Sequence, residues 1–366
     1  MEATQTHTQS QFQFQTGKIP VDALGTELFY VDSGPPVPDS NYTTVILIHG
    51  SGINGKIFEH LVPFAQASSS SNSNHGNHGL RLIIPNRRDY TFSTPYTDSE
   101  LEDLKAGKEE ALQRTGKEMV EVCKYLIERK MVCKITDDGE GKGKGGGKTG
   151  GKKGGIVFLG WSMGNATVLS LFGWPEAVPS QGGNGKEDLE LLDAYVRRMI
   201  LWGEFEIPEE MASNFGEWVT DYWDHPDLSL REASSACLEY TTKRPKNSRP
   251  SIRNLVVEDP NPNSTTLPGS GLPRSDIFEP AAQGRSEMPM YFEPMQGTIK
   301  KQAYKALWNP DPEGGFVLPK VDVVWLTGTK APWYCVWGWE IDGANHLAQW
   351  DEPEKFWSAL VDAVMY

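Results

Sequence analysis

Residues 160–164, Gly-Trp-Ser-Met-Gly, carry the clearest chemical signal in the sequence. They follow an apolar run at 156–161 that predicts a buried strand, and they precede a run that can form a helix. A Gly-x-Ser-x-Gly pattern at such a junction predicts a tight, strained turn that lifts the serine hydroxyl clear of the backbone. The helix dipole and the N–H of Met163 can then stabilise an oxyanion. We interpret Ser162 as a nucleophile; the alternative is an ordinary strand-to-helix turn capped by serine.

A second glycine-rich segment, His-Gly-Ser-Gly at 49–52, ends the apolar run 43–49. A glycine-rich strand end upstream of a nucleophile turn can supply a second backbone N–H to an oxyanion. Ser51 is the expected donor, through its backbone. We interpret His49 as a structural residue that holds this loop, and the alternative is a role in proton transfer.

A serine nucleophile needs a base, and hydrolases built on such a turn place their histidine last in the chain. The sequence contains seven histidines, and His346 is the one that follows the apolar run 321–327. We therefore predict His346 to be the base. The alternative is a histidine that caps a loop.

Elements that could position these residues alternate along the chain. The apolar runs are near-continuous, which is typical of strands covered on both faces of a parallel sheet; they lie at 43–49, 80–85, 156–161, 198–205 and 321–327. Segments 11–20 and 27–31 predict a leading hairpin. Helical patterns lie between the runs, at 99–130, 163–173, 186–197 and 352–365. Strands that alternate with helices in this way predict an α/β protein with helices on both faces of a mostly parallel sheet.

Composition narrows the classes of function. The chain has 366 residues and a formal net charge of −14, from 35 Lys and Arg against 49 Asp and Glu, which disfavours a nucleic-acid partner. Four cysteines lack the spacing of metal or redox pairs. The N-terminus lacks a secretory pattern, and no apolar run is long enough for a membrane span. We expect a cytoplasmic protein with no metal, organic cofactor or membrane span; the oligomeric state stays open.

Low-complexity stretches indicate how the chain is organised. We expect a disordered tail at 1–16 and a first part of the catalytic core at 17–207, which contains a flexible Gly/Lys-rich insert at 134–155. The long, aromatic region 208–315 is expected to form a cap, because a structureless loop of that length is improbable. The core then ends with 316–366.

Three motifs in this order resemble the α/β-hydrolase superfamily: HGSG at 49–52, GWSMG at 160–164 and GANH at 343–346. The resemblance is greatest to uncharacterised fungal proteins with an α/β-hydrolase-1 domain, and it spans about residues 20–366. It implies the α/β-hydrolase fold, with a mostly parallel central sheet and an inserted cap, and a Ser-His-acid triad. It implies no particular substrate.

The segment Arg87-Arg88-Asp89-Tyr90, followed by Ser93, adds to this resemblance. It is similar to the D-x-x-G-x-G-x-S loop after strand four in the epoxide-hydrolase-like branch of the superfamily. A serine at 162, where epoxide hydrolases and haloalkane dehalogenases need aspartate, argues against their chemistry.

The triad acid departs from the pattern of the family. Most members place it after strand seven, but here no Asp or Glu occurs between Asp322 and Glu340. Some members place it after strand six, where Phe-Glu-Ile-Pro at 205–208 resembles their Tyr-Asp-x-Pro. Glu206 is therefore our first choice and Glu204 our second. The alternative is a solvated carboxylate at a strand end.

The connection between strands seven and eight is short. Only residues 328–336 separate Thr327 from a strand expected near 337–342, whereas parallel strands need a crossover of about 10–12 residues or more. Either the crossover helix is lost, or a segment between Gly338 and Trp339 is missing from this sequence.

The sequence as a whole predicts a serine hydrolase that cleaves a carboxylic ester or related acyl compound, with an apolar small molecule as substrate. Ser162 attacks the carbonyl, His346 moves the proton and Glu206 orients the imidazole, while the N–H groups of Ser51 and Met163 hold the oxyanion. Two alternatives stay open. One is an acyltransferase or thioesterase of secondary metabolism, and the other is a catalytically impaired binding protein with a hydrolase fold.

Overall fold

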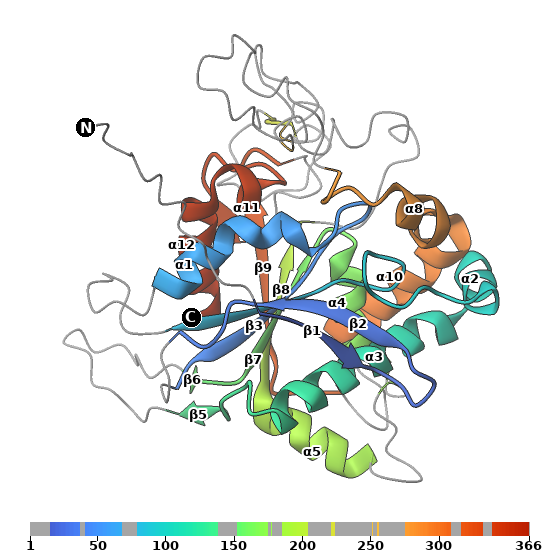
Figure 1. Cartoon of the computed structure of the whole chain (residues 1–366), viewed down its shortest axis with the longest axis horizontal. Coiled ribbons are helices and arrows are strands. Elements are labelled where there is room, and N and C mark those ends of the chain that lie inside the picture. The colour runs from blue at the N-terminus through green and yellow to red at the C-terminus, as the bar shows by residue number, and fades with distance from the viewer. Residues whose placement is uncertain are drawn as a thin grey trace, which may run out of the picture.

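An eight-stranded mixed sheet forms the centre of the computed structural model (Figure 1). The structure describes residues 15–36, 41–67, 79–137, 152–174, 177, 185–203, 221–223, 251, 255, 275–308, 316–331 and 339–365. The strands of the sheet are β1 (Gln15–Pro20), β2 (Glu27–Asp32), β3 (Thr43–Ile48), β4 (Leu80–Pro85), β7 (Ile156–Trp161), β8 (Val196–Trp202), β9 (Asp322–Gly328) and β10 (Trp339–Ile341). Two short strands, β5 (Thr136–Asp137) and β6 (Lys152–Lys153), pair with each other where the Gly/Lys-rich insert leaves and rejoins the core.

The order of strands across the sheet is β1-β2-β4-β3-β7-β8-β9-β10. The hairpin of β1 and β2 is antiparallel, and β2 is antiparallel to β4. All pairs from β4 to β10 are parallel. This arrangement confirms the α/β-hydrolase fold class and the leading hairpin that the sequence predicts.

Helices cover both faces of the sheet. They are η1 (Gly55–Leu61), α1 (Val62–Ala67), α2 (Asp98–Lys105), α3 (Glu109–Glu128), α4 (Gly164–Gly173), α5 (Gly185–Tyr195), α8 (Pro280–Ala282), the π-helical turn η6 (Gln283–Glu287), α9 (Met288–Met290), α10 (Glu293–Leu307), α11 (Ala348–Asp351) and α12 (Pro353–Met365). Figure 1 shows α1 and α12 on one side of the sheet and α3, α4 and α10 on the other.

Alternation along the strands produces two apolar cores. Every residue of β3, β4 and β7 is buried, because successive side chains point to opposite faces and both faces are covered. In β3, Val45 and Leu47 pack with η1, α1 and α12, whereas Ile46 and Ile48 pack with α3 and α4. The near-continuous apolar runs in the sequence are the direct signature of this double burial.

The helix predicted over 99–130 is two helices in the structure, which corrects that prediction. Helix α2 ends at Lys105 and α3 begins at Glu109. Between them Gly107 has a φ of +66°, a left-handed conformation that glycine adopts without strain. A Cβ there would lie 2.4 Å from the carbonyl carbon of Pro294, so the break lets α10 approach closely.

Several predicted segments fall partly outside the described residues. The tail up to 14, the insert from 138 to 151 and most of the expected cap, 208–315, belong to these segments. The end of the expected cap is described and contains α8 to α10. The sheet is completed by β10, whose Trp339 pairs with Leu326 of β9. Strand β10 begins at Trp339, two residues later than the sequence predicts, and residues 332–338 of the connection from β9 lie outside the described residues.

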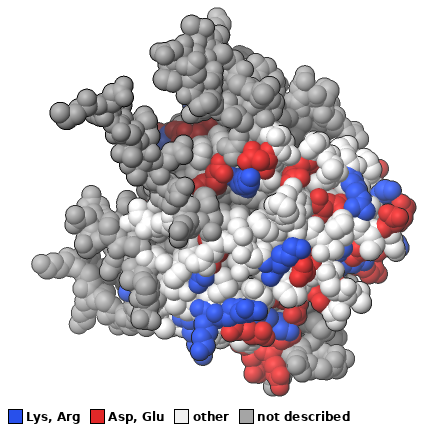
Figure 2. All heavy atoms as spheres, in the orientation of Figure 1, with Lys and Arg blue, Asp and Glu red and all other residues white. Residues whose placement is uncertain are grey.

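On the face shown in Figure 2, basic side chains lie next to acidic ones instead of forming a separate patch. Ion pairs one helical turn apart, such as Lys105–Glu102 and Lys124–Glu121, also place opposite charges side by side. In the described ranges, none of the helices combines the length and the apolar character that crossing a membrane requires.

Two glycine-to-alanine substitutions should change stability in opposite directions. We expect Gly107→Ala to lower the free energy of unfolding by roughly 2 kcal/mol or more, because the left-handed φ is strained and the new methyl group meets the Pro294 backbone. Gly297→Ala, in α10 with open space at its Cβ position, should raise it by about 0.5–1 kcal/mol. Urea denaturation at one pH measures both changes; equal effects would contradict the prediction.

Candidate active site

The predicted nucleophile lies on a strained turn between β7 and α4. Ser162 has a φ of +52°, which is uncommon for a residue with a side chain and is typical of functional turns. The flanking glycines serve a different purpose, since both are needed for close approach. A Cβ at Gly160 would lie 2.7 Å from the backbone nitrogen of Asn165, and one at Gly164 would lie 2.3 Å from the carbonyl oxygen of Ile48. The motif thus presses the first turn of α4 against the end of β3.

The glycine-rich loop after β3 lies directly against this turn. A Cβ at Gly50 would be 3.2 Å from the Cβ of Ser162, so the two segments that carry the predicted oxyanion donors are neighbours. No hydrogen bond within the described part of the chain occupies the backbone N–H of Ser51 or of Met163. Both groups are thus available to a ligand beside Ser162, whose side chain is largely buried.

Three donors converge on the carbonyl oxygen of Gly50. Arg87 Nη2 donates to it at 2.9 Å, and the hydroxyl of Tyr90 lies at 3.4 Å. His49 Nε2 accepts from the backbone N–H of Arg87 at 3.0 Å, so we assign the ring hydrogen to Nδ1, which donates to the same oxygen at 2.9 Å. Burial and the charge of Arg87 hold the pKa of His49 well below its ordinary value. The imidazole of His49 is thus neutral and hydrogen bonded at both ring nitrogens, which agrees with a structural role.

A carboxylate from the described end of the expected cap also contacts this loop. The side chain of Ser51 donates to Glu287 Oε2 at 2.5 Å and accepts from the hydroxyl of Tyr291 at 2.6 Å. Glu287 Oε1 pairs with Arg87 Nη2 at 2.7 Å. Side-chain exposure is only 12% for Arg87 and 3% for Glu287, so this is a buried ion pair whose second carboxylate oxygen accepts from Ser51.

The buried pair changes the titration of its neighbours. Burial alone would lower the pKa of Arg87, but the negative charge of Glu287 together with Tyr90, Tyr96 and Tyr291 outweighs this effect and the pKa is raised. Burial, assisted by the same charge, raises the pKa of Tyr291. Both side chains therefore keep their protons at neutral pH and act as hydrogen-bond donors.

A second ion pair links the same two segments. Arg285 donates to Asp89 Oδ1 at 2.9 Å and to the carbonyl of Tyr96 at 2.6 Å. Asp89 has a φ of +68°, so the backbone of the loop after β4 is strained at the residue that binds Arg285. Alongside, the backbone N–H of Asn54 donates to the carbonyl of Ile277. The segment from 277 to 291 is thus bound to the loops after β3 and β4.

His346 lies at the same edge of the sheet as Ser162. Its backbone oxygen accepts from Trp161 Nε1 at 3.0 Å, and its ring stacks on Trp202 with centroids 6.5 Å apart. A Cβ at Gly203 would lie 2.3 Å from Cε1 of the imidazole. The ring therefore rests on the residue that directly follows β8.

The imidazole is not hydrogen bonded to the predicted nucleophile. Neither ring nitrogen of His346 has a hydrogen-bond partner among the described residues, and the residue is only 2% exposed. Burial lowers its pKa to about 3. The structure thus brings Ser162, Ser51 and Met163 together and places His346 nearby, but no contact in the described chain joins the base to the serine.

Both predicted triad acids, Glu206 and Glu204, lie outside the described residues. The sequence did not single out Glu287 and Tyr291. Both form hydrogen bonds with Ser51, although they are 236 and 240 residues away from it in the chain. The only signal in the sequence was the two adjacent arginines Arg87-Arg88, in the loop that resembles a family motif. Arginines buried in that loop would need a carboxylate partner from elsewhere in the chain.

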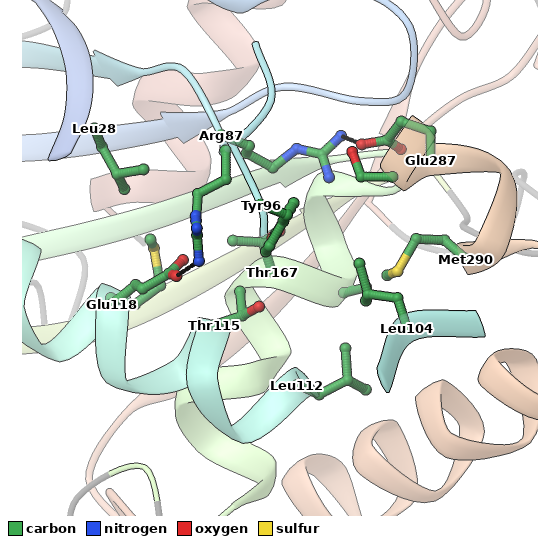
Figure 3. Close-up of a pocket in the computed structure, with 14 residues that line it drawn as sticks. Leu28, Arg87, Tyr96, Leu104, Leu112, Thr115, Glu118, Thr167, Glu287 and Met290 are labelled. Atoms are coloured by element: carbon green, nitrogen blue, oxygen red, sulfur yellow. Dashed lines mark hydrogen bonds and ion pairs between the residues drawn. The ribbon is translucent and has the colours of Figure 1, made fainter. Parts of the chain in front are cut away.

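A small cavity of about 30 Å³ lies next to this network, lined by charged and apolar side chains (Figure 3). Arg87 pairs with Glu287 at one side of it. Arg88, at the other, binds both oxygens of Glu100 at 2.7 and 2.9 Å and contacts Glu118 at 3.4 Å. The volume is enough for a single water molecule and too small for a substrate.

The described residues include no group of three or more His, Cys, Asp or Glu side chains arranged to hold a metal ion.

Comparisons with protein-family models and with curated proteins found no match. Among solved structures, the N-acyl homoserine lactonase AidH complexed with N-butanoyl homoserine is 14% identical, with a TM-score of 0.45 and coverage of 95% of each chain. The esterase EaEST from Exiguobacterium antarcticum is 16% identical, with a TM-score of 0.39 and coverage of 95% of this chain and 98% of that chain. The haloalkane dehalogenase DpaA from Paraglaciecola agarilytica NO2 is 12% identical, with a TM-score of 0.44 and coverage of 97% and 95%. Likeness at this level assigns neither activity nor substrate to this chain.

Glu118 should make stability depend on pH. Burial raises its pKa to about 7, although Arg88 opposes this rise. The folded state therefore binds a proton more tightly than the unfolded state, whose carboxyl has an ordinary pKa near 4.3, and stability is lost as pH rises between these values. The slope is at most about 1.4 kcal/mol per pH unit.

We expect Glu118→Gln to remove this loss, because the amide resembles the protonated acid and Arg88 keeps Glu100 as its partner. The difference in free energy of unfolding between variant and wild type should grow in favour of the variant from pH 5 to pH 8. Urea titrations at four pH values measure it. A difference that stays constant would show that Glu118 is ionised throughout.

Proposed function

We propose that this chain, which has the α/β-hydrolase fold, is a serine hydrolase that cleaves a carboxylic ester or a related acyl compound. The observation that carries the proposal is the geometry around Ser162. It has a positive φ at the tip of β7, and the unoccupied N–H groups of Met163 and Ser51 belong to the two segments beside it. A nucleophile next to two backbone donors is what acyl transfer requires.

In the proposed reaction Ser162 Oγ attacks the carbonyl carbon and its proton passes to His346. The carbonyl oxygen becomes an oxyanion held by the N–H groups of Met163 and Ser51. When this intermediate collapses, the alcohol leaves with the proton from His346. Water then attacks the acyl-enzyme by the same route and releases the acid and free Ser162.

We assign the triad acid to Glu206, with Glu204 as second choice. A carboxylate beside His346 would stabilise the imidazolium that forms during the reaction, which burial alone disfavours. The position of the imidazole supports this choice, because its ring rests on Gly203 and the chain continues from there to Glu204 and Glu206. His346 must also move to reach Ser162.

The cap and the substrate belong to the same proposal. Region 208–315 would form the cap, and the contacts of its described end with the loops after β3 and β4 support a position over Ser162. Met163 packs in one apolar cluster with Met290 and Met295 from that end. An apolar small-molecule ester is the substrate class that we propose.

One observation favours a second candidate, a binding protein with a hydrolase fold and impaired catalysis. His346 has no hydrogen-bond partner among the described residues, and its neutral form is strongly favoured. Such a protein would bind the same apolar molecules without turning them over.

Labelling with a fluorophosphonate distinguishes the two candidates. We expect the wild-type protein to be labelled and Ser162→Ala to lose both the label and ester hydrolysis, the latter by at least about 10³-fold, because the variant has no nucleophile. Circular dichroism of both proteins controls for folding. Absence of label on folded wild-type protein would favour the binding protein, and label retained by the variant would place the nucleophile elsewhere.

Two carboxylate variants test the triad acid on a series of p-nitrophenyl esters. We expect Glu206→Gln to lower kcat/KM by about 10²–10⁴-fold, since the imidazolium loses its partner, and Glu204→Gln to remain near wild type. The reverse order would exchange their roles. Wild-type activity in both variants would exclude the end of β8 as the source of the acid.

A further inference from the structure

The peptide unit between Gly50 and Ser51 joins the proposed oxyanion donor to a strongly bound carbonyl. In a trans peptide the C=O of one residue and the N–H of the next point in opposite directions across one rigid plane. Any group that holds the Gly50 oxygen therefore also sets the direction of the Ser51 N–H. The structure describes three such groups, His49 Nδ1, Arg87 Nη2 and the hydroxyl of Tyr90.

Arg87, one of these three groups, forms an ion pair with Glu287 of the segment 277–291. Its Nη2 donates to the Gly50 oxygen at 2.9 Å and forms an ion pair with Glu287 Oε1 at 2.7 Å. The second oxygen of the same carboxylate accepts from the side chain of Ser51. Glu287 thus contacts the peptide from both ends, through Arg87 at its carbonyl end and through the Ser51 hydroxyl at its amide end.

We propose that Glu287 is a positioning residue that fixes the Gly50–Ser51 peptide, so that the Ser51 N–H points at the oxyanion only when the segment 277–291 is bound to the core. This inference rests on the proposed serine hydrolase activity. Glu287 itself touches no reacting atom. Its buried charge is matched by Arg87, and two hydroxyls, of Ser51 and Tyr291, complete the network.

The chain offers a matched control for simple binding of the cap segment. Arg285 lies two residues before Glu287 and forms an ion pair with Asp89 in the same loop that carries Arg87. Neither Arg285 nor Asp89 contacts Gly50 or Ser51 through any interaction of the described residues. Removal of this pair takes one of several contacts from the segment and none from Gly50 or Ser51.

The test compares Glu287→Gln with Arg285→Gln in the full-length protein. We expect Glu287→Gln to lower kcat for a p-nitrophenyl ester by about 10–100-fold with little change in KM, because an oxyanion donor acts in the transition state. The affinity for an alkylboronic acid, which forms a tetrahedral adduct on a nucleophilic serine, should fall in parallel. Arg285→Gln should change kcat by less than about threefold.

Hydrogen exchange in the peptide 49–54 provides a readout that does not need catalysis. There the N–H groups of Gly52 and Asn54 are hydrogen bonded, to the Tyr90 hydroxyl at 2.8 Å and to the carbonyl of Ile277 at 2.9 Å. We expect faster exchange in Glu287→Gln and not in Arg285→Gln. If wild type fails to hydrolyse esters, the proposed function fails, and the exchange result still decides the inference.

Three results would overturn the inference: unchanged exchange in Glu287→Gln, unchanged kcat in an active enzyme, or equal losses in both variants, which would indicate docking of the segment alone.

Should Glu287→Gln not fold, Ser51→Ala takes its place, because it separates Glu287 from the loop and leaves the pair with Arg87 intact. A decrease in kcat at constant KM is then expected. Wild-type kcat in Ser51→Ala would overturn the inference equally.

Discussion

The contact between Gly164 and the end of β3 is the constraint on which the rest of the site depends. Because a side chain at 164 would lie 2.3 Å from the carbonyl oxygen of Ile48, only glycine lets the first turn of α4 approach β3 this closely. That approach places Ser162 beside Gly50 and makes the two loops after β7 and β3 neighbours. Ser162, in the turn between the two elements, has a positive φ.

Buried charge is the second determinant, and it comes from loops, not from the sheet. The loop after β4 contributes Arg87 and Asp89. Arg87 pairs with Glu287 of the segment 277–291, and Asp89 pairs with Arg285 of the same segment. A buried ion pair contributes little net stability when it can be replaced by apolar residues, but loss of one partner leaves an uncompensated charge. The buried Arg87–Glu287 pair therefore favours one relative placement of the loop and the segment over others, whereas Arg285 is 39% exposed and its pair contributes less.

The sequence predicts the sheet well because each central strand is covered on both faces. Strand β4 matches its apolar run of 80–85 residue for residue, and β7 matches 156–161. The break at Gly107 escapes prediction, since a glycine within a charged amphipathic pattern is compatible with a continuous helix. Glu287 escapes it for another reason: its partner Ser51 is 236 residues away, and no local pattern records a contact made only by the tertiary structure.

The site is organised unequally on its two sides. The Gly50–Ser51 peptide, which carries one proposed oxyanion donor, is held by an ion pair, a neutral histidine and three hydroxyls. Such a preorganised arrangement is suited to stabilising developing charge. His346, by contrast, is packed by Trp161 and Trp202 without a polar partner among the described residues. Burial of a neutral imidazole makes the protonated state of the base unfavourable until a carboxylate approaches its ring. In the proposed mechanism, electrostatic stabilisation is therefore a property of the described core, whereas proton transfer depends on the carboxylate that we assign to Glu206.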